Sequence, residues 1–419
     1  MPKVKYWNRL KSGFQLNTII KKYYEEVNSA QKQGKLTAAV SLGFPSEILY
    51  GFDIIPFYPQ NHASVYAALN RSREAIFAAE KLGVPDELCS ELKIALNTFL
   101  YQKHLCVKLP QPDMVLCSTN VCKSTIKFAE KLGSANDIPV FILDIPPIPA
   151  DDSGEGLPEH HRSYITAQFF KLLDFLKDNF NVDIVEEKIM TATRLSAEAS
   201  LLWNEIVNFS GLIPAPFDAL DLYTHMFPYN VLRGREEVVT HYKLLKSEIV
   251  HRMEEGISGI KNERIRLLWD YMPIFSRNNF FFKLLSKNEA SVVATTFFFP
   301  GAGNECRDGK CDITMDAESL EEVFGKWANA YSRLYSAVGV ETKARIISEL
   351  VGKLSIDGII MHRDRSCKPQ SLPQNQLERL VMEKYEIPCL SIEADSADPR
   401  MFSEAQITTR VEAFLESLI

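Results

Sequence analysis

The feature that most constrains the fold is an alternation of short apolar runs with longer segments of helical periodicity. In the first third of the chain it gives, in order, a strand at 54–58, a helix at 86–101, a strand at 114–117, a helix at 121–132 and a strand at 140–143. Such an alternation is typical of parallel α/β units. We therefore expect a doubly wound parallel-sheet domain over residues 1–150, with a helical N-terminal extension to about residue 34.

A proline-rich stretch and a long helical block interrupt this alternation. Residues 145–154 contain three prolines and can continue neither a helix nor a central strand, so they predict a linker. Helical periodicity then covers 163–208, with a break at 179–181, and returns at 236–256. These patterns predict a helical middle block over residues 151–262.

The strand and helix alternation resumes at about residue 264. The expected strands are 267–269, 291–296, 358–362 and 389–392, and the expected helices are 319–338, 342–354, 374–385 and 402–418. They predict a second doubly wound parallel-sheet domain over residues 263–419, so the fold class is α/β. Open α/β sheets bind ligands at the carboxyl ends of their strands. We therefore expect the functional site between the two α/β domains.

Three cysteines lie at junctions where such a site is expected. Cys89 and Cys122 each open a helical segment, where a helix N-terminus lowers the pKa of a thiol and favours the thiolate. Cys367 lies in the basic segment 362–369, which follows a predicted strand. The alternative for each is a small, buried packing residue. Three thiolates at such junctions favour an iron–sulfur cluster with one iron left open.

The remaining cysteines give weaker signals. Cys117 precedes Cys122 by five residues, and this spacing is also compatible with a zinc site. Cys306 and Cys311 lie in a polar, glycine-rich segment that lacks the two further ligands of a zinc knuckle, so we expect an exposed loop with incidental thiols. Cys106 and Cys389 lie in apolar runs and are expected to be packing residues.

Composition and missing motifs exclude several classes of function. A net charge of -7 and a pI near 5.7 argue against nucleic acid as the main partner. No apolar run is long enough to span a bilayer, and the first residues do not form a signal peptide, so we expect a cytoplasmic protein with no membrane partner. The chain contains no GxSxG, Walker A or HExxH motif, so ATP hydrolysis by the chain itself is not expected.

Several segments, in register along nearly the whole chain, resemble the 2-hydroxyacyl-CoA dehydratase and benzoyl-CoA reductase subunit family. They are Gly43-Phe44-Pro45 leading into Pro56-Phe57-Tyr58-Pro59-Gln60-Asn61, then Cys89-Ser90, Pro112-Asp113 through Cys122, Ile138-Pro139 through Asp144, Asp357-Gly358 before Arg365-Ser366-Cys367-Lys368, and Asp395-Ser396 through Arg400. Each segment is weak evidence alone, but their common order is strong evidence.

The resemblance implies a cofactor, a reaction and partners. It assigns Cys89, Cys122 and Cys367 as the ligands of a [4Fe–4S] cluster, in agreement with the interpretation of the three junctions. It implies one-electron reduction of an acyl-CoA thioester to a ketyl radical, which expels the hydroxyl group and makes the β-proton acidic. The implied partners are an acyl-CoA substrate, an identical or paralogous second subunit in a dimer, and a separate ATP-dependent iron–sulfur activator.

One position departs from the family pattern. Gln60 stands where related substrate-binding subunits carry Glu, and an amide cannot transfer a proton as a carboxylate does. A serine of the neighbouring loop is replaced by Leu42, and Ser41 lies next to it, so Gln60 and Ser41 are the candidate catalytic residues. The leading hypothesis is a dehydratase subunit. The alternatives are a subunit of an ATP-dependent aryl-CoA reductase of the benzoyl-CoA type, and a non-catalytic electron-transfer or scaffold subunit.

Overall fold

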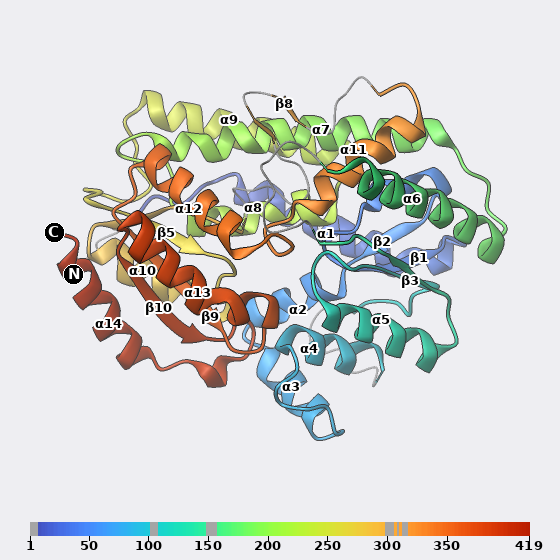
Figure 1. Ribbon diagram of the computed structural model, residues 1–419, viewed down its shortest axis with the longest axis horizontal. Coiled ribbons are helices and arrows are strands. Elements are labelled where there is room, and N and C mark those ends of the chain that lie inside the picture. The colour runs from blue at the N-terminus through green and yellow to red at the C-terminus, as the bar shows by residue number, and fades with distance from the viewer. Residues whose placement is uncertain (1–6, 101–107, 148–156, 298–305, 308–309, 312–316) are drawn as a thin grey trace.

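The computed structural model contains two parallel sheets joined by a helical block, and it describes residues 7–100, 108–147, 157–297, 306–307, 310–311 and 317–419 (Figure 1). The N-terminal sheet consists of β1 (Thr37–Val40), β2 (Ile55–Phe57), β3 (Met114–Ser118) and β4 (Val140–Leu143). The C-terminal sheet consists of β5 (Ile265–Asp270), β6 (Ala290–Thr295), β9 (Gly358–Asp364) and β10 (Cys389–Ala394). The expected α/β class with an additional helical block is confirmed.

The two sheets have the same topology. Their strand orders are β2-β1-β3-β4 and β10-β9-β5-β6, and every pairing between neighbouring strands is parallel. Read from β6 to β10, the C-terminal sheet places its second strand in the chain at one edge, followed by the first, the third and the fourth, as the N-terminal sheet does. The order reverses between β1 and β3 and between β5 and β9, and such a switch point is where an open α/β sheet leaves a crevice for a ligand.

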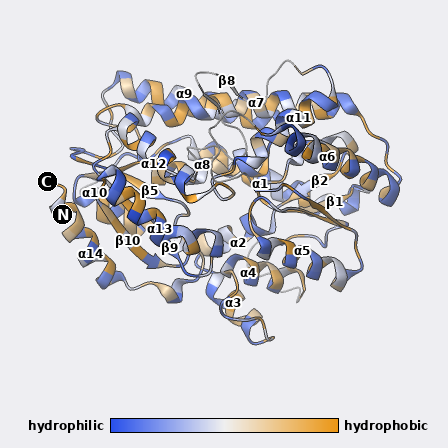
Figure 2. Ribbon diagram, in the orientation of Figure 1, coloured by the Kyte–Doolittle hydropathy of each residue, from blue (hydrophilic) through white to orange (hydrophobic). Residues whose placement is uncertain are grey.

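Helices cover both faces of the C-terminal sheet. Leu268, Ile359 and Met361 pack in a hydrophobic cluster with residues of α12 (Val340–Leu354) and α13 (Lys368–Tyr385). The alternate residues Leu267 and Ile360 join the main core, to which α10 (Asn278–Lys287) and α14 (Glu404–Ser417) contribute. Successive strand residues point to opposite faces, so a strand that is apolar throughout must be covered on both sides. Figure 2 shows the apolar strands between helices whose polar sides face outward.

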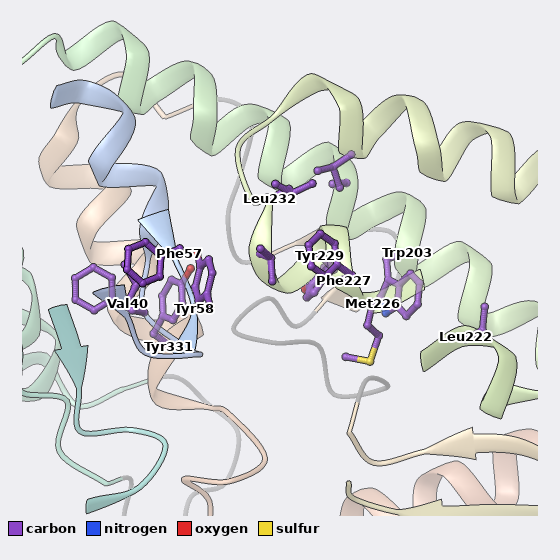
Figure 3. Packing of buried hydrophobic residues seen from close by; sticks show 14 of the residues in the cluster. Val40, Phe57, Tyr58, Trp203, Leu222, Met226, Phe227, Tyr229, Leu232 and Tyr331 are labelled. Carbon is purple, nitrogen blue, oxygen red and sulfur yellow. The ribbon is translucent and has the colours of Figure 1, made fainter. Parts of the chain in front are cut away.

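The remaining helices form the N-terminal layers and the middle block. They are α1 (Gly13–Ser29), α2 (Pro59–Ala68), α3 (Ser72–Glu80), α4 (Ser90–Phe99), α5 (Lys123–Asn136), α6 (Glu159–Phe180), α7 (Glu186–Asn208), α8 (Ala219–Val231), α9 (Glu236–Glu254) and α11 (Leu320–Ser332). Figure 3 shows Trp203, Met226 and Tyr229 packed beneath the long helices of this block, and Tyr331 beside Phe57 of the N-terminal sheet. The helix α11, which follows the C-terminal sheet's second strand in the chain, therefore packs on the N-terminal side of the molecule.

The structure confirms the seven predicted strands and adds one strand to the parallel sheets that the sequence did not indicate. That strand is β1, whose sequence Thr-Ala-Ala-Val is only four residues long and has two alanines at its centre. The helices α2, α3, α8 and α10 were also not predicted. The helix α13 begins at Lys368, six residues before the expected 374, because Pro369 lies in its first turn, where no backbone N–H is required.

Other predictions meet different outcomes. Four residues of the segment expected to be a loop form a short antiparallel ladder of β7 (Cys306–Arg307) and β8 (Lys310–Cys311), so the prediction of irregular structure was wrong for these residues. The predicted exposure of the loop and the incidental role of its thiols stay predictions. Cys389 is half-buried and packs against the smaller hydrophobic cluster, as expected. Cys106 and most of the proline-rich stretch lie outside the described residues, and the domain boundaries stay a prediction. Among the described helices, none combines the length and apolarity needed to cross a bilayer.

Candidate active site

The carboxyl ends of both sheets face one cavity of about 130 Å³, which we call the inner cavity. Its walls come from the loops that follow β1, β3, β5, β6, β9 and β10, together with the start of α4, the end of α8 and the segment after α11. The residues are Leu42, Gly43, Gln60, Cys89, Glu91, Val121, Cys122, Met226, Asn230, Tyr271, Met272, Thr296, Phe297, Leu334, Tyr335, Ser336, Asp364, Cys367, Pro369 and Ser396. The predicted location of the site, between the sheets at the carboxyl ends of their strands, agrees with this cavity.

The three cysteines singled out from the sequence all line the inner cavity. Each also has the same local position, because Cys89 is the N-cap residue of α4, Cys122 that of α5 and Cys367 that of α13. A helix N-terminus carries partial positive charge and favours a thiolate or another anion beside it. Three helix N-termini therefore present three thiols to one space, although the thiols are far apart in the sequence.

Hydrogen bonds across the domain boundary hold two of these cysteines near one another. The backbone N–H of Ser90, next to Cys89, donates to Ser366 Oγ over 3.1 Å, and Ser366 precedes Cys367. Ser90 Oγ also donates to Asp395 Oδ1 over 2.5 Å. The start of α4 and the loop before α13 are thus fixed against each other by buried polar groups.

The charged group that is hydrogen-bonded to the backbone of Cys367 is a carboxylate, not a cation. Asp364 Oδ1 accepts hydrogen bonds from the backbone N–H groups of Ser366 and Cys367, both over 3.2 Å. The flanking arginines point elsewhere, since Arg363 pairs with Glu378 and the half-exposed Arg365 with Glu393. The prediction of a basic setting was therefore wrong, because successive strand residues alternate in direction and only Asp364 turns toward the loop.

Burial raises the pKa of two of the three thiols. It does so for Cys89, with a further contribution from the Glu91 carboxylate, and for Cys367, with a further contribution from Asp364. The expected lowering of the thiol pKa is thus outweighed by burial and by neighbouring carboxylates. A metal ion reverses this balance, because it binds the thiolate and displaces the thiol proton.

Cys117, which lies five residues before Cys122 and is the alternative to it as the second cluster ligand, lies elsewhere. It is buried within β3, and it does not line the inner cavity. Among the described residues, no group of three His, Cys, Asp or Glu side chains is close enough together to hold a single metal ion. A four-iron cluster needs wider spacing, because each thiolate binds a different iron.

The two candidate catalytic residues have different positions. Gln60 is buried, lines the inner cavity, and accepts a hydrogen bond at Oε1 from the backbone N–H of Leu42 over 3.1 Å. Ser41 does not line the inner cavity. Its Oγ accepts a hydrogen bond from the backbone N–H of Ser118 over 3.1 Å, so it ties β1 to β3.

One ionisable residue of the inner cavity was not identified from the sequence. Glu91 lies in the first turn of α4, and its Oε1 accepts a hydrogen bond from Ser64 Oγ over 3.2 Å. Burial raises the pKa of Glu91 to about 8. Its place two residues after Cys89, in the same first helical turn, was the signal that could have identified it.

The sequence matches the family model described as 2-hydroxyglutaryl-CoA dehydratase, D-component, over residues 41–418. The chain belongs to this family. The family resemblance seen in the sequence segments is thereby confirmed, and the chain is a dehydratase-like subunit. The matched region includes every residue of the inner cavity, so the family relationship covers the site as well as the fold.

Relatives of this dehydratase family chain include enzymes of two named reactions. It is 27% identical over 407 residues to "(R)-2-hydroxyisocaproyl-CoA dehydratase alpha subunit" of Clostridioides difficile, covering 96% of this chain and 94% of the relative. It is 23% identical to the alpha subunit of (R)-2-hydroxyglutaryl-CoA dehydratase of Acidaminococcus fermentans, covering 96% of each. It is also 24% identical to a benzoyl-CoA reductase subunit of Thauera aromatica, covering 94% of this chain and 91% of the relative.

Proposed function

We propose that this chain is the iron–sulfur subunit of a 2-hydroxyacyl-CoA dehydratase-type enzyme, in which Cys89, Cys122 and Cys367 hold one [4Fe–4S] cluster. One observation carries the proposal: three thiols from distant segments, each at a helix N-terminus, line one cavity at the carboxyl ends of both sheets. Family membership supports the dehydratase type.

The donor set fits such a cofactor. Iron–sulfur clusters are held by cysteine thiolates, and three thiols leave one iron of a four-iron cluster without a protein ligand. Among the described residues, the inner cavity has no fourth cysteine in its walls. When bound, the cluster would supply an electron to the substrate thioester and a Lewis-acidic iron beside it.

The surrounding side chains suit an elimination of water from a 2-hydroxyacyl thioester. The Gln60 amide has an NH₂ group that can donate a hydrogen bond to a substrate oxygen, because its carbonyl oxygen is already bonded to the Leu42 N–H. The Leu42, Val121 and Phe297 side chains exclude water from the inner cavity, and the exclusion strengthens every polar contact within it. The product would be the corresponding enoyl-CoA.

We also propose partners for this chain. The relatives are named as single subunits of their enzymes, which supports a second polypeptide, identical or paralogous, that completes the enzyme. The chain itself has no Walker A motif, so a separate ATP-dependent iron–sulfur protein would supply the low-potential electron.

Anaerobic iron and sulfide analysis, with electron paramagnetic resonance, tests the cluster. We expect Cys89→Ala, Cys122→Ala and Cys367→Ala each to lose most of the iron and sulfide. Cys117→Ala is the matched control, because Cys117 is a buried thiol near Cys122 in sequence that does not line the inner cavity. A wild-type protein without iron and sulfide, or an equal loss in the control, would reject the proposal.

Gln60 favours a second candidate, an aryl-CoA reductase. A buried amide replaces the carboxylate at this position, and a benzoyl-CoA reductase subunit is among the relatives. With the second subunit and the activator present, enoyl-CoA formed from a 2-hydroxyacyl-CoA supports the dehydratase. Dienoyl-CoA formed from benzoyl-CoA supports the reductase. Turnover of any acyl-CoA by this chain with the activator alone would reject the non-catalytic electron-transfer or scaffold role.

A further inference from the structure

Several side chains in the wall of the inner cavity are apolar. Leu42, Val121, Met226 and Leu334 contribute aliphatic and thioether surface. In Figure 3 the Met226 side chain points away from the long helices of the block. Such a surface gains free energy when it contacts an apolar substrate group and displaces water.

A rigid aromatic wall adds to this surface. The Tyr271 ring meets the Phe297 ring edge to face, with centroids 5.7 Å apart, and stacks on the Tyr335 ring at 6.1 Å. Tyr271 itself has a left-handed backbone, with φ at 71°, and its N–H donates to Thr296 Oγ1 over 2.7 Å. A bulky residue keeps that conformation only where its surroundings hold it, so this wall has little freedom to rearrange around a different ligand.

The charged groups in the wall of the inner cavity are carboxyl groups, and the buried cation Lys343 lies outside this wall, near Asp270 and 5.1 Å from the centroid of the Tyr335 ring. Of the described residues that line the inner cavity, Glu91 and Asp364 carry carboxyl groups, and none is Lys, Arg or His. The cations that flank Cys367 in the sequence are engaged outside the cavity: Arg363 pairs with Glu378, Arg365 pairs with Glu393, and the exposed Lys368 donates to the carbonyl oxygen of Arg365. A second carboxylate on a bound acyl group would therefore lose its water, meet no cation in the wall and lie near two acidic side chains.

A neighbouring cavity of about 290 Å³, the outer cavity, offers no alternative partner at the reacting end. The two cavities share five lining residues, which are Leu42, Met226, Asn230, Met272 and Phe297. Among the described residues of the outer cavity, the one basic side chain is Arg9. It is exposed, donates to Asn279 Oδ1, and lies over the Phe282 ring, and neither of these residues lines the inner cavity.

We propose that the substrates of this site are acyl-CoA thioesters with an uncharged, apolar acyl chain, and that thioesters with a second carboxylate are excluded. The inference rests on the proposed function, because it assumes that the acyl group reaches the inner cavity. The apolar wall selects for the chain, and the two carboxyl groups of a wall that has no cation select against an acidic end.

Binding of two unreactive thioesters to the anaerobic holoenzyme tests this selectivity. The probes are 4-methylpentanoyl-CoA and glutaryl-CoA, which have acyl chains of the same length and lack the 2-hydroxyl group, so neither can be dehydrated. We expect the dissociation constant of glutaryl-CoA to be about a hundredfold higher or more, since an unpaired buried charge is strongly disfavoured. Equal affinities, or tighter binding of glutaryl-CoA, would overturn the inference and leave the proposed function standing. Failure of both thioesters to bind would overturn both.

Variants with a new cation provide the second test. Val121→Lys places an ammonium group at a half-buried position of the wall, and Met226→Lys does so at a buried one. We expect either variant to shift the ratio of the two affinities toward glutaryl-CoA by tenfold or more. The matched controls Val121→Gln and Met226→Gln have a polar side chain without charge. They should leave the ratio of the two dissociation constants within about threefold of the wild-type ratio, which is less than the tenfold shift expected for the lysine variants. An equal shift in the controls would contradict the electrostatic argument.

Discussion

The two sheets share one strand order but differ in the polar groups beside their switch points. At the N-terminal switch, between β1 and β3, the buried groups that tie the loops together are neutral. At the C-terminal switch, between β5 and β9, they are carboxylates. Both groups of polar side chains hold loops that carry a cysteine of the inner cavity. The shared strand order therefore decides where these loops lie, and the side chains decide their charge.

The neutral set is centred on Asn120. Its Oδ1 accepts from Ser118 Oγ over 2.7 Å, and its Nδ2 donates to the carbonyl oxygens of Gly43 and Tyr331 over 3.2 and 2.9 Å. Gly43 has a positive φ of 76°, and an added Cβ there would come within 2.7 Å of the Val121 side chain. The Asn120 side chain therefore joins the loop after β1 to the end of α11. Only a side chain with both a donor and an acceptor can make all three hydrogen bonds.

The acidic set consists of Asp270, Asp364 and Asp395. Asp270 accepts from Tyr335 Oη over 3.0 Å and from Gln370 Nε2 over 2.9 Å. Asp364 accepts three backbone N–H groups, and Asp395 accepts those of Ala397 and Asp398 over 2.9 and 2.8 Å. Carboxylates accept several N–H groups at once, so they suit loops that turn back on themselves.

The difference teaches that one topology can place two chemically unlike edges around one cavity. The parallel strand order decides where the loops meet, since both switch points open at carboxyl ends. The side chains then decide what each sheet contributes. The neutral edge, the carboxyl end of the N-terminal sheet around Asn120, adds no charge to the apolar wall. The acidic edge, the carboxyl end of the C-terminal sheet with Asp270, Asp364 and Asp395, orients backbone N–H groups and Cys367. Exchanging charge between the edges should therefore damage both.

The largest effect is expected when a charge is added to the neutral edge. Asn120→Asp replaces an amide NH₂ that bonds two carbonyl oxygens with a carboxylate oxygen that repels them. Asn120 is buried, so we expect a loss of about 3–5 kcal/mol in the free energy of unfolding at neutral pH. Denaturant titration measures it. Asn120→Ala, which loses the bonds without adding charge, should cost about 1–3 kcal/mol, and an equal cost for both variants would contradict the role of charge.

The reciprocal change at the acidic edge is expected to be smaller. Asp364→Asn keeps one acceptor oxygen but turns an NH₂ group toward either the Ser366 and Cys367 N–H groups or the Ser396 N–H. We expect a loss of about 2–3 kcal/mol, together with a lower iron content, because Cys367 loses its fixed position. Iron analysis and denaturant titration report the two effects. An unchanged iron content would show that Asp364 does not position Cys367.

Two buried histidines of the helical block should contribute a loss of stability at acid pH, whereas Glu91, whose pKa burial raises to about 8, contributes in the opposite direction. His225 Nδ1 and His241 Nε2 lie 3.1 Å apart, so one of the two nitrogens must be unprotonated. Burial lowers the pKa of His225 to about 3 and that of His241 to about 4. Both values lie below the ordinary value of about 6.5, so the unfolded chain binds protons first as the pH falls. The stability that these two histidines contribute is therefore fully present above about pH 6.5 and is lost progressively below it.

Thermal unfolding between pH 7 and pH 5 measures this loss. We expect each of the two histidines to contribute on the order of 2 kcal/mol across that interval. His225→Gln should flatten the dependence on pH. The matched control is His251→Gln, because His251 is exposed on the same helix as His241, and its profile should follow the wild type. A His225→Gln profile as steep as the wild type would contradict the assignment.

The smallest effect is expected at the contact that joins the two halves near Cys89. Arg400 donates to both carboxylate oxygens of Glu80, over 2.9 and 2.7 Å, and so connects the segment after β10 to α3. The pair is partly exposed, so Arg400→Lys should cost only about 1 kcal/mol. We expect the weaker contact to appear as faster amide hydrogen exchange in α3 of the Arg400→Lys variant. Arg73→Lys, at an exposed position of α3, is the control, and equal exchange in both variants would remove Arg400 from this role.

The local parts of the site were predictable, but its surroundings were not. Cys89, Cys122 and Cys367 were expected at element junctions because a helix start depends on nearby residues. The basic setting of Cys367 was predicted wrongly, since the direction of a side chain depends on which neighbour faces it. Ser41 was expected in the site, but its hydroxyl is used between β1 and β3. Glu91 was missed, because burial and not sequence gives it an unusual pKa.

The sequence by itself determined the alternation of strands and helices, the family, the two helix starts at Cys89 and Cys122, and the place of Cys367 after a strand. These follow from periodicity and from segments of a few residues, which local interactions encode. Only the tertiary structure decided that the three cysteines meet at one cavity and which charges surround it. The bond between Ser90 and Ser366 joins residues 276 positions apart, and no local pattern records such a contact. Strand order, which brings these ends together, is a property of the assembled sheets.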